Sequence, residues 1–150
     1  MHRIRKFAVD GSSSVLAGSG QPGFAGDKGP ADKAVVNFPI ALVAALDGSV
    51  FFADRGNFRI RRISRDGLIE TVVGTGRFQF TADGSVGAET SIGVIEQLAI
   101  DPGGGLLFVD STFRRVRRLR PDGIVETVAG NGEAGGKGDG GPALDASFTQ

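Results

Sequence analysis

The feature that most constrains this chain is a repeat, because the same landmarks return every 56 residues without an insertion. A fixed period of this length is the signature of an architecture in which each repeat forms one supersecondary unit. The period therefore predicts a tandem-repeat fold. The clearest landmarks are the pairs Asp10-Gly11, Asp66-Gly67 and Asp122-Gly123 and the glycines Gly18, Gly74 and Gly130.

Each repeat is expected to contain four short strands. In the central repeat these are residues 41–46, 50–53, 59–63 and 68–73, with turns at 47–48, 54–57 and 66–67. An Asp-Gly pair between apolar runs is a strong hairpin signal, because both residues tolerate positive φ. Four antiparallel strands repeated in tandem are typical of a propeller blade. We therefore predict an all-β chain that forms a β-propeller of four-stranded antiparallel blades.

The repeat boundaries divide the chain into parts of one partial propeller that spans residues 1–150. Residues 1–38 form the end of one blade and a long loop, 39–94 form a complete repeat, and 95–150 form a complete repeat that ends in a long loop. The 150 residues hold about 2.7 repeats, whereas propellers have typically 4–8 blades. We expect the remaining blades of the same parent chain to be its first partners.

The long loop after the fourth strand accounts for the excess over the ~40–45 residues of a compact blade. Pro30 and Pro142 each stand where a short helical turn could begin. We therefore expect a helical turn in each loop, with small apolar side chains packed beneath it. These side chains are Ala31, Ala34 and Val36 in one loop and Ala143, Ala146 and Phe148 in the other.

Composition narrows the possible functions. Lys plus Arg equals Asp plus Glu at 17 each, so net charge does not favour nucleic acid or an anionic membrane as the main partner. The absence of Cys excludes disulfides and thiolate metal sites. No apolar run approaches the ~20 residues of a membrane span, so we expect no membrane insertion. His2 is the only histidine, which leaves no material for a Ser-His-Asp site, and we predict no catalytic residue and no cofactor.

The residue patterns resemble the NHL repeat family of β-propellers. The pattern D-x-G-N-x-R-I-R-x-I stands at residues 54–63, and T-V-A-G-x-G followed by G-D-G-G-P-A stands at 127–132 and 138–143. The resemblance covers essentially the whole chain and is greatest to the long repeats of bacterial secreted proteins and teneurin-like domains. It implies a six-bladed ring and favours a secreted or periplasmic location. Departures at 82–87 and 111–113 argue against a binding code repeated in every blade.

The long loops carry two motifs with a possible ligand role. The G-x-G-x-x-G pattern at 18–23 and 130–135 lacks the long helix of a dinucleotide site, so we interpret its glycines as turn residues. Asp27, Asp83 and Asp139 recur and could ligate calcium or bond to loop amides. Calcium requires ~6–8 oxygens, and each loop offers one or two carboxylates, which favours an Asx-type bond. We predict no metal site.

The third strands are rich in arginine and allow two interpretations. An RNA-binding surface, as in some NHL proteins, needs aromatic stacking platforms, and the chain has no Tyr or Trp. The favoured interpretation is that these arginines pair with Asp54 and Asp110 at blade contacts. Only Asn37 and Glu96 lie near the starts of first strands, where ligands of an axial metal would project. The arginines are Arg59, Arg61, Arg62, Arg114, Arg115, Arg117 and Arg118.

We expect the chain to be a scaffold that binds a protein or a small extracellular ligand through the loops between blades, because loops on a rigid framework can vary freely. One alternative is part of a propeller hydrolase or lyase whose catalytic residues lie in other blades. A second is an RNA-binding NHL surface. The candidate binding residues are Asp27, Lys28, Asn37, Asp54, Arg55, Asn57, Asp110 and Asp139.

Overall fold

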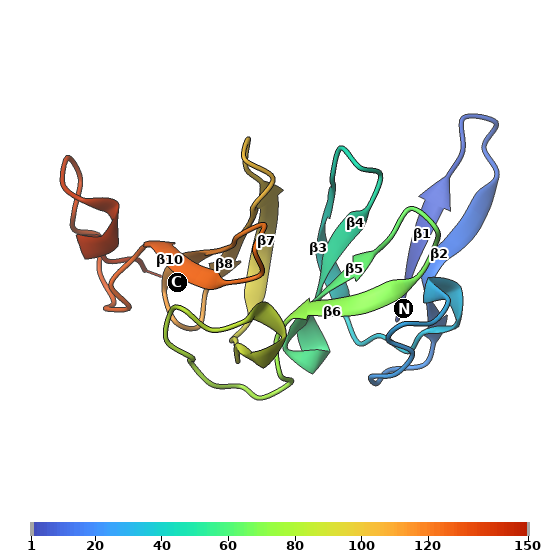
Figure 1. Ribbon diagram of the computed structural model, residues 1–150, viewed down its shortest axis with the longest axis horizontal. Coiled ribbons are helices and arrows are strands. Elements are labelled where there is room, and N and C mark those ends of the chain that lie inside the picture. Colours follow the sequence, from blue (N-terminus) through green and yellow to red (C-terminus); the bar gives the residue numbers. More distant parts are fainter. Residues whose placement is uncertain (1, 150) are drawn as a thin grey trace.

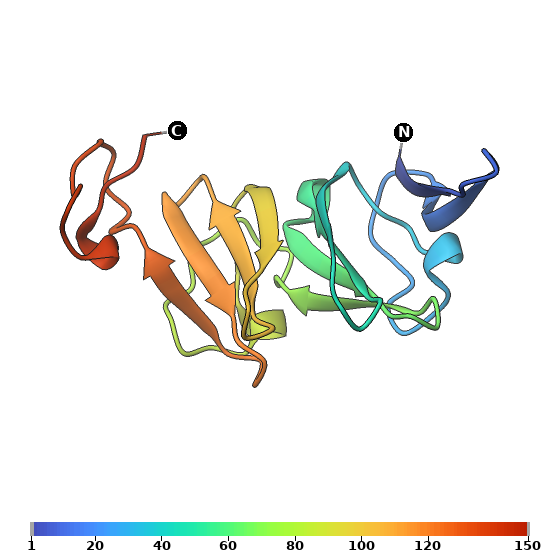
Figure 2. The same ribbon diagram turned by 90° about the horizontal axis from the view of Figure 1, so that it is seen from above.

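The computed structural model describes residues 2–149 and contains one hairpin and two four-stranded antiparallel sheets (Figures 1 and 2). Strands follow one another within each sheet in chain order. The hairpin consists of β1 (His2–Phe7) and β2 (Ser13–Gly20). Sheet A consists of β3 (Pro39–Ala44), β4 (Val50–Asp54), β5 (Arg59–Ile63) and β6 (Ile69–Val73), and sheet B of β7 (Ile95–Ile100), β8 (Leu106–Asp110), β9 (Arg115–Leu119) and β10 (Val125–Ala129).

The first strand of sheet A begins and ends two residues earlier than predicted. Pro39 pairs with Asp54, which extends β3 at its start. At its other end the Ala45 amide donates to the Ser49 carbonyl at 2.9 Å, and the Asp47 carboxylate accepts from the Ser49 amide at 2.9 Å. This closed turn leaves Leu46 exposed at the tip rather than in the strand. Local turn chemistry therefore ends the strand before its apolar run is complete.

Both faces of sheet A are buried. The neighbouring residues Phe52 and Ala53 of β4 belong to opposite cores, and neither is exposed. One core lies between sheets A and B, and the other lies between sheet A and the segment that includes β2 and the loop after it. Burial on both faces explains why the strands read as near-continuous apolar runs. The first core is built from Ala53, Ile60, Val73, Ile92, Ile95, Leu106, Phe108 and Val125.

The predicted helical turns are present as the 3-10 helices η1 (Ala31–Lys33) and η4 (Ala143–Asp145), and the middle loop has η3 (Gly87–Glu89). Ala31, Ala34 and Val36 are buried as expected. The expectation for the last loop is wrong for Ala143, which is exposed, while Ala146 and Phe148 are half-buried. The first loop is buried because sheet A lies against it, and no strand of the described chain covers the last one.

Each of the first two long loops adds backbone hydrogen bonds to the outer strand of the next sheet. The Lys28 amide donates to the Ile69 carbonyl at 2.6 Å, and the Ile69 amide donates to the Gly29 carbonyl at 3.0 Å. The second loop does the same to Val125 of β10. The loops therefore cover strand edges that would otherwise expose unpaired donors and acceptors. This is the reason for the long repeat.

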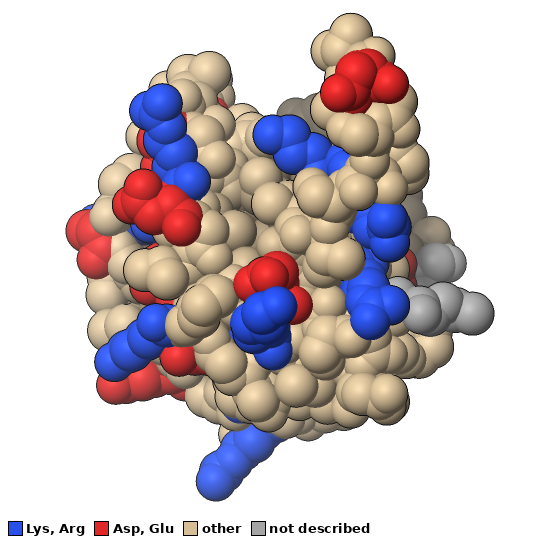
Figure 3. Space-filling view, turned by 90° about the vertical axis from the view of Figure 1, so that its right-hand side faces the viewer, with Lys and Arg blue, Asp and Glu red and all other residues tan. Residues whose placement is uncertain are grey.

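The molecule has two distinct faces. The loop face carries η2 (Arg55–Asn57), the equivalent turn of sheet B at 111–114 and the start of the second long loop, and it lies below in Figure 1. The hairpin face carries the β1–β2, β3–β4 and β7–β8 turns, which point upward in Figure 1. Figure 3 views the end formed by β1 and β2, where charges of both signs are interspersed. No single-sign field covers that end.

Candidate binding face

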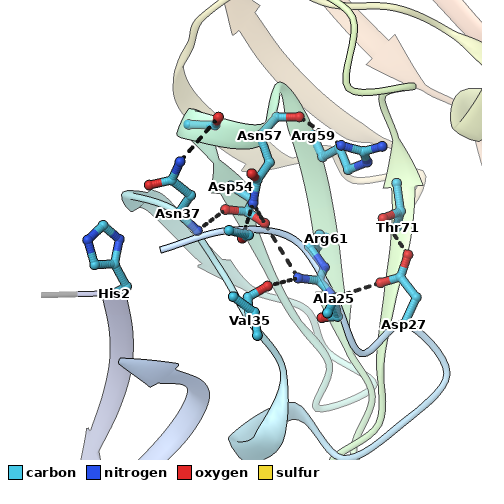
Figure 4. A network of polar contacts seen from close by, with 12 residues as sticks. His2, Ala25, Asp27, Val35, Asn37, Asp54, Asn57, Arg59, Arg61 and Thr71 are labelled. Atoms are coloured by element: carbon cyan, nitrogen blue, oxygen red, sulfur yellow. Dashed lines mark hydrogen bonds and ion pairs between the residues drawn. The ribbon is translucent and has the colours of Figure 1, made fainter. Parts of the chain in front are cut away.

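A buried arginine anchors the first long loop to sheet A (Figure 4). The Arg61 side chain is fully buried, and its Nη2 lies 2.7 Å from Oδ1 of Asp27 while its Nη1 lies 3.4 Å from Oδ2 of Asp54. It also donates to the Val35 carbonyl at 3.0 Å and the Ala25 carbonyl at 3.2 Å. One guanidinium thus joins two carboxylates and two loop carbonyls. The predicted pairing of strand arginines with Asp54 is confirmed for Arg61.

Asp54 holds the loop face from beneath. It is fully buried, and its Oδ1 accepts the Asn37 amide at 2.7 Å while its Oδ2 accepts the Asn57 side-chain amide at 2.8 Å. Asn57 also donates to the Gly23 carbonyl at 2.7 Å. Burial raises the pKa of Asp54, and the hydrogen bonds from Asn57 and Asn37 partly oppose that rise. Asp54 is therefore closed to solvent and positions the loop segments around it.

The recurring loop aspartates bond to side chains of the next sheet. Asp27 Oδ2 accepts the Thr71 hydroxyl at 2.7 Å in addition to its ion pair with Arg61. Asp83 likewise accepts the Thr127 hydroxyl at 2.9 Å. The expected Asx-type bond to loop amides is wrong for Asp27, because the loop runs along the neighbouring sheet and brings its carboxylate to β5 and β6. These aspartates therefore connect consecutive repeat units through side-chain contacts.

Sheet B contains a weaker version of the same network. Arg117 is fully buried and its Nη2 lies 3.0 Å from Asp83, but it forms no ion pair with Asp110, so the predicted pairing is wrong at this position. Asp110 instead accepts the Gly93 amide at 3.0 Å and the Phe113 amide at 3.2 Å. Phe113 stands where the repeat has Asn57 and supplies no side-chain donor. Arg117 Nε and Nη1 are buried without a hydrogen-bond partner.

The G-x-G motif has a packing role. Arg59 donates to the Asn57 carbonyl at 3.0 Å and to the Thr75 carbonyl at 2.8 Å, and a Cβ at Gly76 would collide with its guanidinium. Gly20 lies in the same way beneath Arg3, and Gly132 beneath Arg115. Positive φ also favours glycine at these positions. The motif therefore seats an arginine that ties the turn to the start of the long loop.

Two phenylalanines of the long loops complete the arginine sites. The Arg59 guanidinium carbon lies 3.8 Å from the Phe24 ring centroid, and that of Arg115 lies 4.5 Å from the Phe80 ring centroid. These are cation–π contacts. The arginine-rich strands are thus largely engaged in holding the loops, and the fully buried Arg61 and Arg117 are closed to solvent.

The structure distributes the predicted site residues over three environments. Asp54 and Asp110 are buried, whereas Asn37, Arg55 and Asn57 lie at the loop face. Arg55 forms an ion pair at 3.5 Å with Glu96 of the next sheet, and the Asn37 side-chain amide donates to the Gly56 carbonyl at 3.4 Å. Asp27, Lys28 and Asp139 belong to the long loops, and Lys28 bonds to the end of β6 that is remote from the loop face. Asp139 is exposed and has no partner among the described residues.

An aromatic cluster on the loop face was missed by the sequence analysis. Phe58 and Phe78 have ring centroids 5.1 Å apart, and Phe78 and Phe113 have centroids 6.1 Å apart. Phe80 completes the cluster at 5.5 Å from Phe113. The signal was available, because Phe58, Phe78 and Phe113 interrupt the repeat. Because the chain has no Tyr or Trp, an aromatic surface was not expected.

Residues 2–149 contain no group of three or more His, Asp or Glu side chains that could hold a metal ion. They also include no helix that is long and apolar enough to cross a membrane.

Comparison with known proteins decides the fold. No protein-family model matches the chain. A protein of unknown function from Bacteroides thetaiotaomicron is 23% identical and superposes with a TM-score of 0.73, covering 99% of this chain and 35% of that chain. A streptogramin B lyase structure is 17% identical with a TM-score of 0.55, covering 84% and 33%. The fold of the present chain is a β-propeller.

Two further relatives are similar to parts of the propeller. An auxiliary nutrient binding protein from Bacteroides thetaiotaomicron is 18% identical with a TM-score of 0.63, covering 90% of this chain and 33% of that chain. Human teneurin-4 is 34% identical over 76 residues, which span 44% of this chain and 3% of teneurin-4. The chain therefore spans about a third of the solved structures and a small part of teneurin-4. Sheets A and B are two complete blades.

Proposed function

We propose that this propeller is a scaffold that binds a protein or a small extracellular ligand through its loop face. The observation that carries the proposal is a contrast between two layers of that face. Beneath it, the buried guanidinium groups of Arg61 and Arg117 hold the long loops through ion pairs with Asp27 and Asp83, which recur with the repeat. Above it, side chains such as Phe78 and Arg77 are exposed and change between repeats. A rigid base with a variable surface suits recognition.

The similar proteins support a binding role in general terms. One structural neighbour is named as a nutrient binding protein, and teneurin-4 shares local sequence. We assign the chain to the NHL type of propeller because of the motifs at residues 54–63 and 127–143. From that resemblance we propose a ring of six blades and a secreted or periplasmic location.

A further blade is proposed to pack on the outer face of sheet B. Val109 and Val116 are half-buried there, whereas Ala53 and Ile60, at the same repeat positions in sheet A, are fully buried by sheet B. Asp139 occupies the repeat position of Asp27, whose carboxylate contacts the following blade. Analytical ultracentrifugation of the chain tests this proposal: Val116→Asp is expected to abolish self-association, and Leu46→Asp on the hairpin face is not. A strictly monomeric wild-type chain would contradict it.

The binding function is tested with a panel of soluble saccharides and 12-residue peptides, using the shift in melting temperature as readout. A loop-face variant, Asn37→Ala with Arg55→Ala, is compared with a hairpin-face variant, Leu46→Ala with Arg65→Ala. Loss of the shift only in the loop-face variant is expected. Loss only in the hairpin-face variant, or no shift with any compound, would overturn the proposal.

Two alternatives remain, and the second can be tested with the present chain. A role as part of a propeller lyase or hydrolase is suggested by the streptogramin B lyase among the structural neighbours, and it requires catalytic groups in other blades. RNA binding requires a complex with single-stranded RNA that weakens steeply with salt. Retention of the chain on immobilised single-stranded RNA at low salt, with release at high salt, would favour RNA over a protein ligand.

A further inference from the structure

The loop face has an aromatic seam, which we define as Phe58, Phe78 and Phe113, at the junction of sheets A and B. Phe58 lies in the turn between β4 and β5, Phe113 lies in the turn between β8 and β9, and Phe78 lies in the long loop between sheets A and B. Their rings form a continuous series of tilted contacts at 5.1 and 6.1 Å between centroids. Phe78, in the middle, is 55% exposed. The seam therefore presents an apolar surface that spans both blades.

The blade itself does not require these aromatic residues. The positions equivalent to Phe58 hold His2 and Arg114, and those equivalent to Phe78 hold Pro22 and Ala134. Residues that the fold needs recur every 56 positions, whereas within residues 2–149 the seam occurs only at the junction of sheets A and B.

Phe58 also has a φ of 50°, a left-handed conformation that is unfavourable for a bulky side chain. Arg114 adopts a φ of 51° at the equivalent position, so the turn imposes this conformation whichever residue is present. Asn or Gly would satisfy the turn with less strain. The strain therefore belongs to the turn and is present with or without an aromatic ring at this position.

The charge beside the seam is positive. Arg77 precedes Phe78, is exposed, and has no ion-pair partner among the described residues. Of the nearby acidic groups, Asp54 and Asp110 are buried and Glu96 is paired with Arg55. The overall neutrality of the chain thus conceals a local excess of positive charge at this junction.

We propose that the aromatic seam binds an extended acidic segment of another protein, which packs an apolar side chain on Phe78 and places a carboxylate against Arg77. The inference rests on the proposed binding function of the loop face and deepens it. Aromatic residues, including phenylalanine, and arginine are enriched in the cores of protein interfaces. A peptide is favoured over RNA because the seam rings are mutually tilted, by 56° and 36°, and only Phe78 is exposed, so they do not form a set of parallel stacking platforms.

The test is selection of a phage-displayed library of random 12-residue peptides on the full chain, followed by measurement of Kd for synthetic copies of the enriched sequences. Enrichment of Asp or Glu beside Leu, Phe or Trp is expected. Phe78→Ala and Arg77→Glu are each expected to raise Kd at least tenfold. The matched controls Leu46→Ala and Arg65→Glu, on the hairpin face, are expected to leave Kd unchanged. Unaltered thermal unfolding of each variant shows that it folds.

Three outcomes would overturn the inference. Enriched peptides that bind Phe78→Ala as tightly as wild type would place the site elsewhere, and sensitivity to Asn37→Ala instead would preserve the proposed function while removing the seam. Absence of any enriched acidic sequence would exclude the stated partner. Binding of single-stranded RNA that depends on Phe78, without enriched peptides, would assign the seam to nucleic acid.

Discussion

Asp27 Oδ1 lies 2.7 Å from Arg61 Nη2, although the two residues are 34 positions apart and belong to consecutive repeat units. The same pair recurs as Asp83 and Arg117 at 3.0 Å. Each loop thus closes onto the blade that follows it. Stability in this chain is therefore expected to concentrate at blade junctions rather than within single blades.

The two buried arginines should differ in their contribution to stability. Arg61→Met leaves Asp54 buried without its guanidinium, and a loss of about 3–5 kcal/mol is expected. Arg117→Met removes two unpartnered nitrogens and leaves Asp110 with two amide donors, so a smaller loss of about 1–3 kcal/mol is expected. Urea unfolding with equal m-values measures both. An equal loss would show that the networks are equivalent.

The loop aspartates offer a matched pair. Asp27→Ala removes the ion pair to a fully buried guanidinium and the bond to Thr71, so a clear fall in the urea midpoint is expected. Asp139→Ala is expected to leave the midpoint of the same chain unchanged, because Asp139 has no partner within residues 2–149. A fall for Asp139→Ala would indicate that copies of the chain already engage it.

Replacement of three positive-φ glycines by alanine should destabilise the fold to different extents, in an order set by the atoms around each glycine. Gly67→Ala meets no neighbouring atom and should cost only the backbone penalty, roughly 1–2 kcal/mol. Gly76→Ala should cost more, because it displaces the Arg59 guanidinium from its two carbonyls. Gly74→Ala should cost most, because its Cβ meets the Phe58 carbonyl, which cannot move freely. Thermal melts of the three variants give the order, and any other order contradicts the packing role of the motif.

Acid should remove the contribution of Asp101. The Gly105 amide lowers the pKa of Asp101, burial opposes this, and Arg118 lowers it further. A depressed carboxylate pKa stabilises the fold above the unfolded pKa, and this contribution disappears as pH falls below about 4. Asp101→Asn is thus expected to be less stable than wild type at pH 7, with the difference in melting temperature vanishing in acid.

Asp54 should have the opposite dependence, because burial raises its pKa. The native state then holds the proton more tightly than the unfolded chain, so the contribution of Asp54 falls as pH rises through its native pKa. The difference in melting temperature between Asp54→Asn and wild type should therefore not shrink in acid, whereas the difference for Asp101→Asn should. Parallel curves for the two variants would contradict the assignment.

The 56-residue period by itself determined the strand count of each blade, the turns and the helical turns of the long loops. These features depend on local chemistry, such as Asp-Gly hairpins and Pro before η1, and that chemistry is readable along the chain. The repeat also favoured structural roles for Asp27 and Arg61, although Asp27 was a candidate binding residue as well. The predicted strand bounds were wrong where a local turn ended a strand early, as at Leu46.

Only the tertiary structure decided which blade each loop serves and which partner each charge takes. Asp27 reaches Arg61 and Thr71 because its loop runs along the next sheet, and Asp110 accepts backbone amides rather than pairing with Arg117. The aromatic seam likewise appears only when two blades and a loop converge. Periodicity encodes what a unit needs from itself, whereas contacts between units depend on distances that no spacing in the sequence specifies.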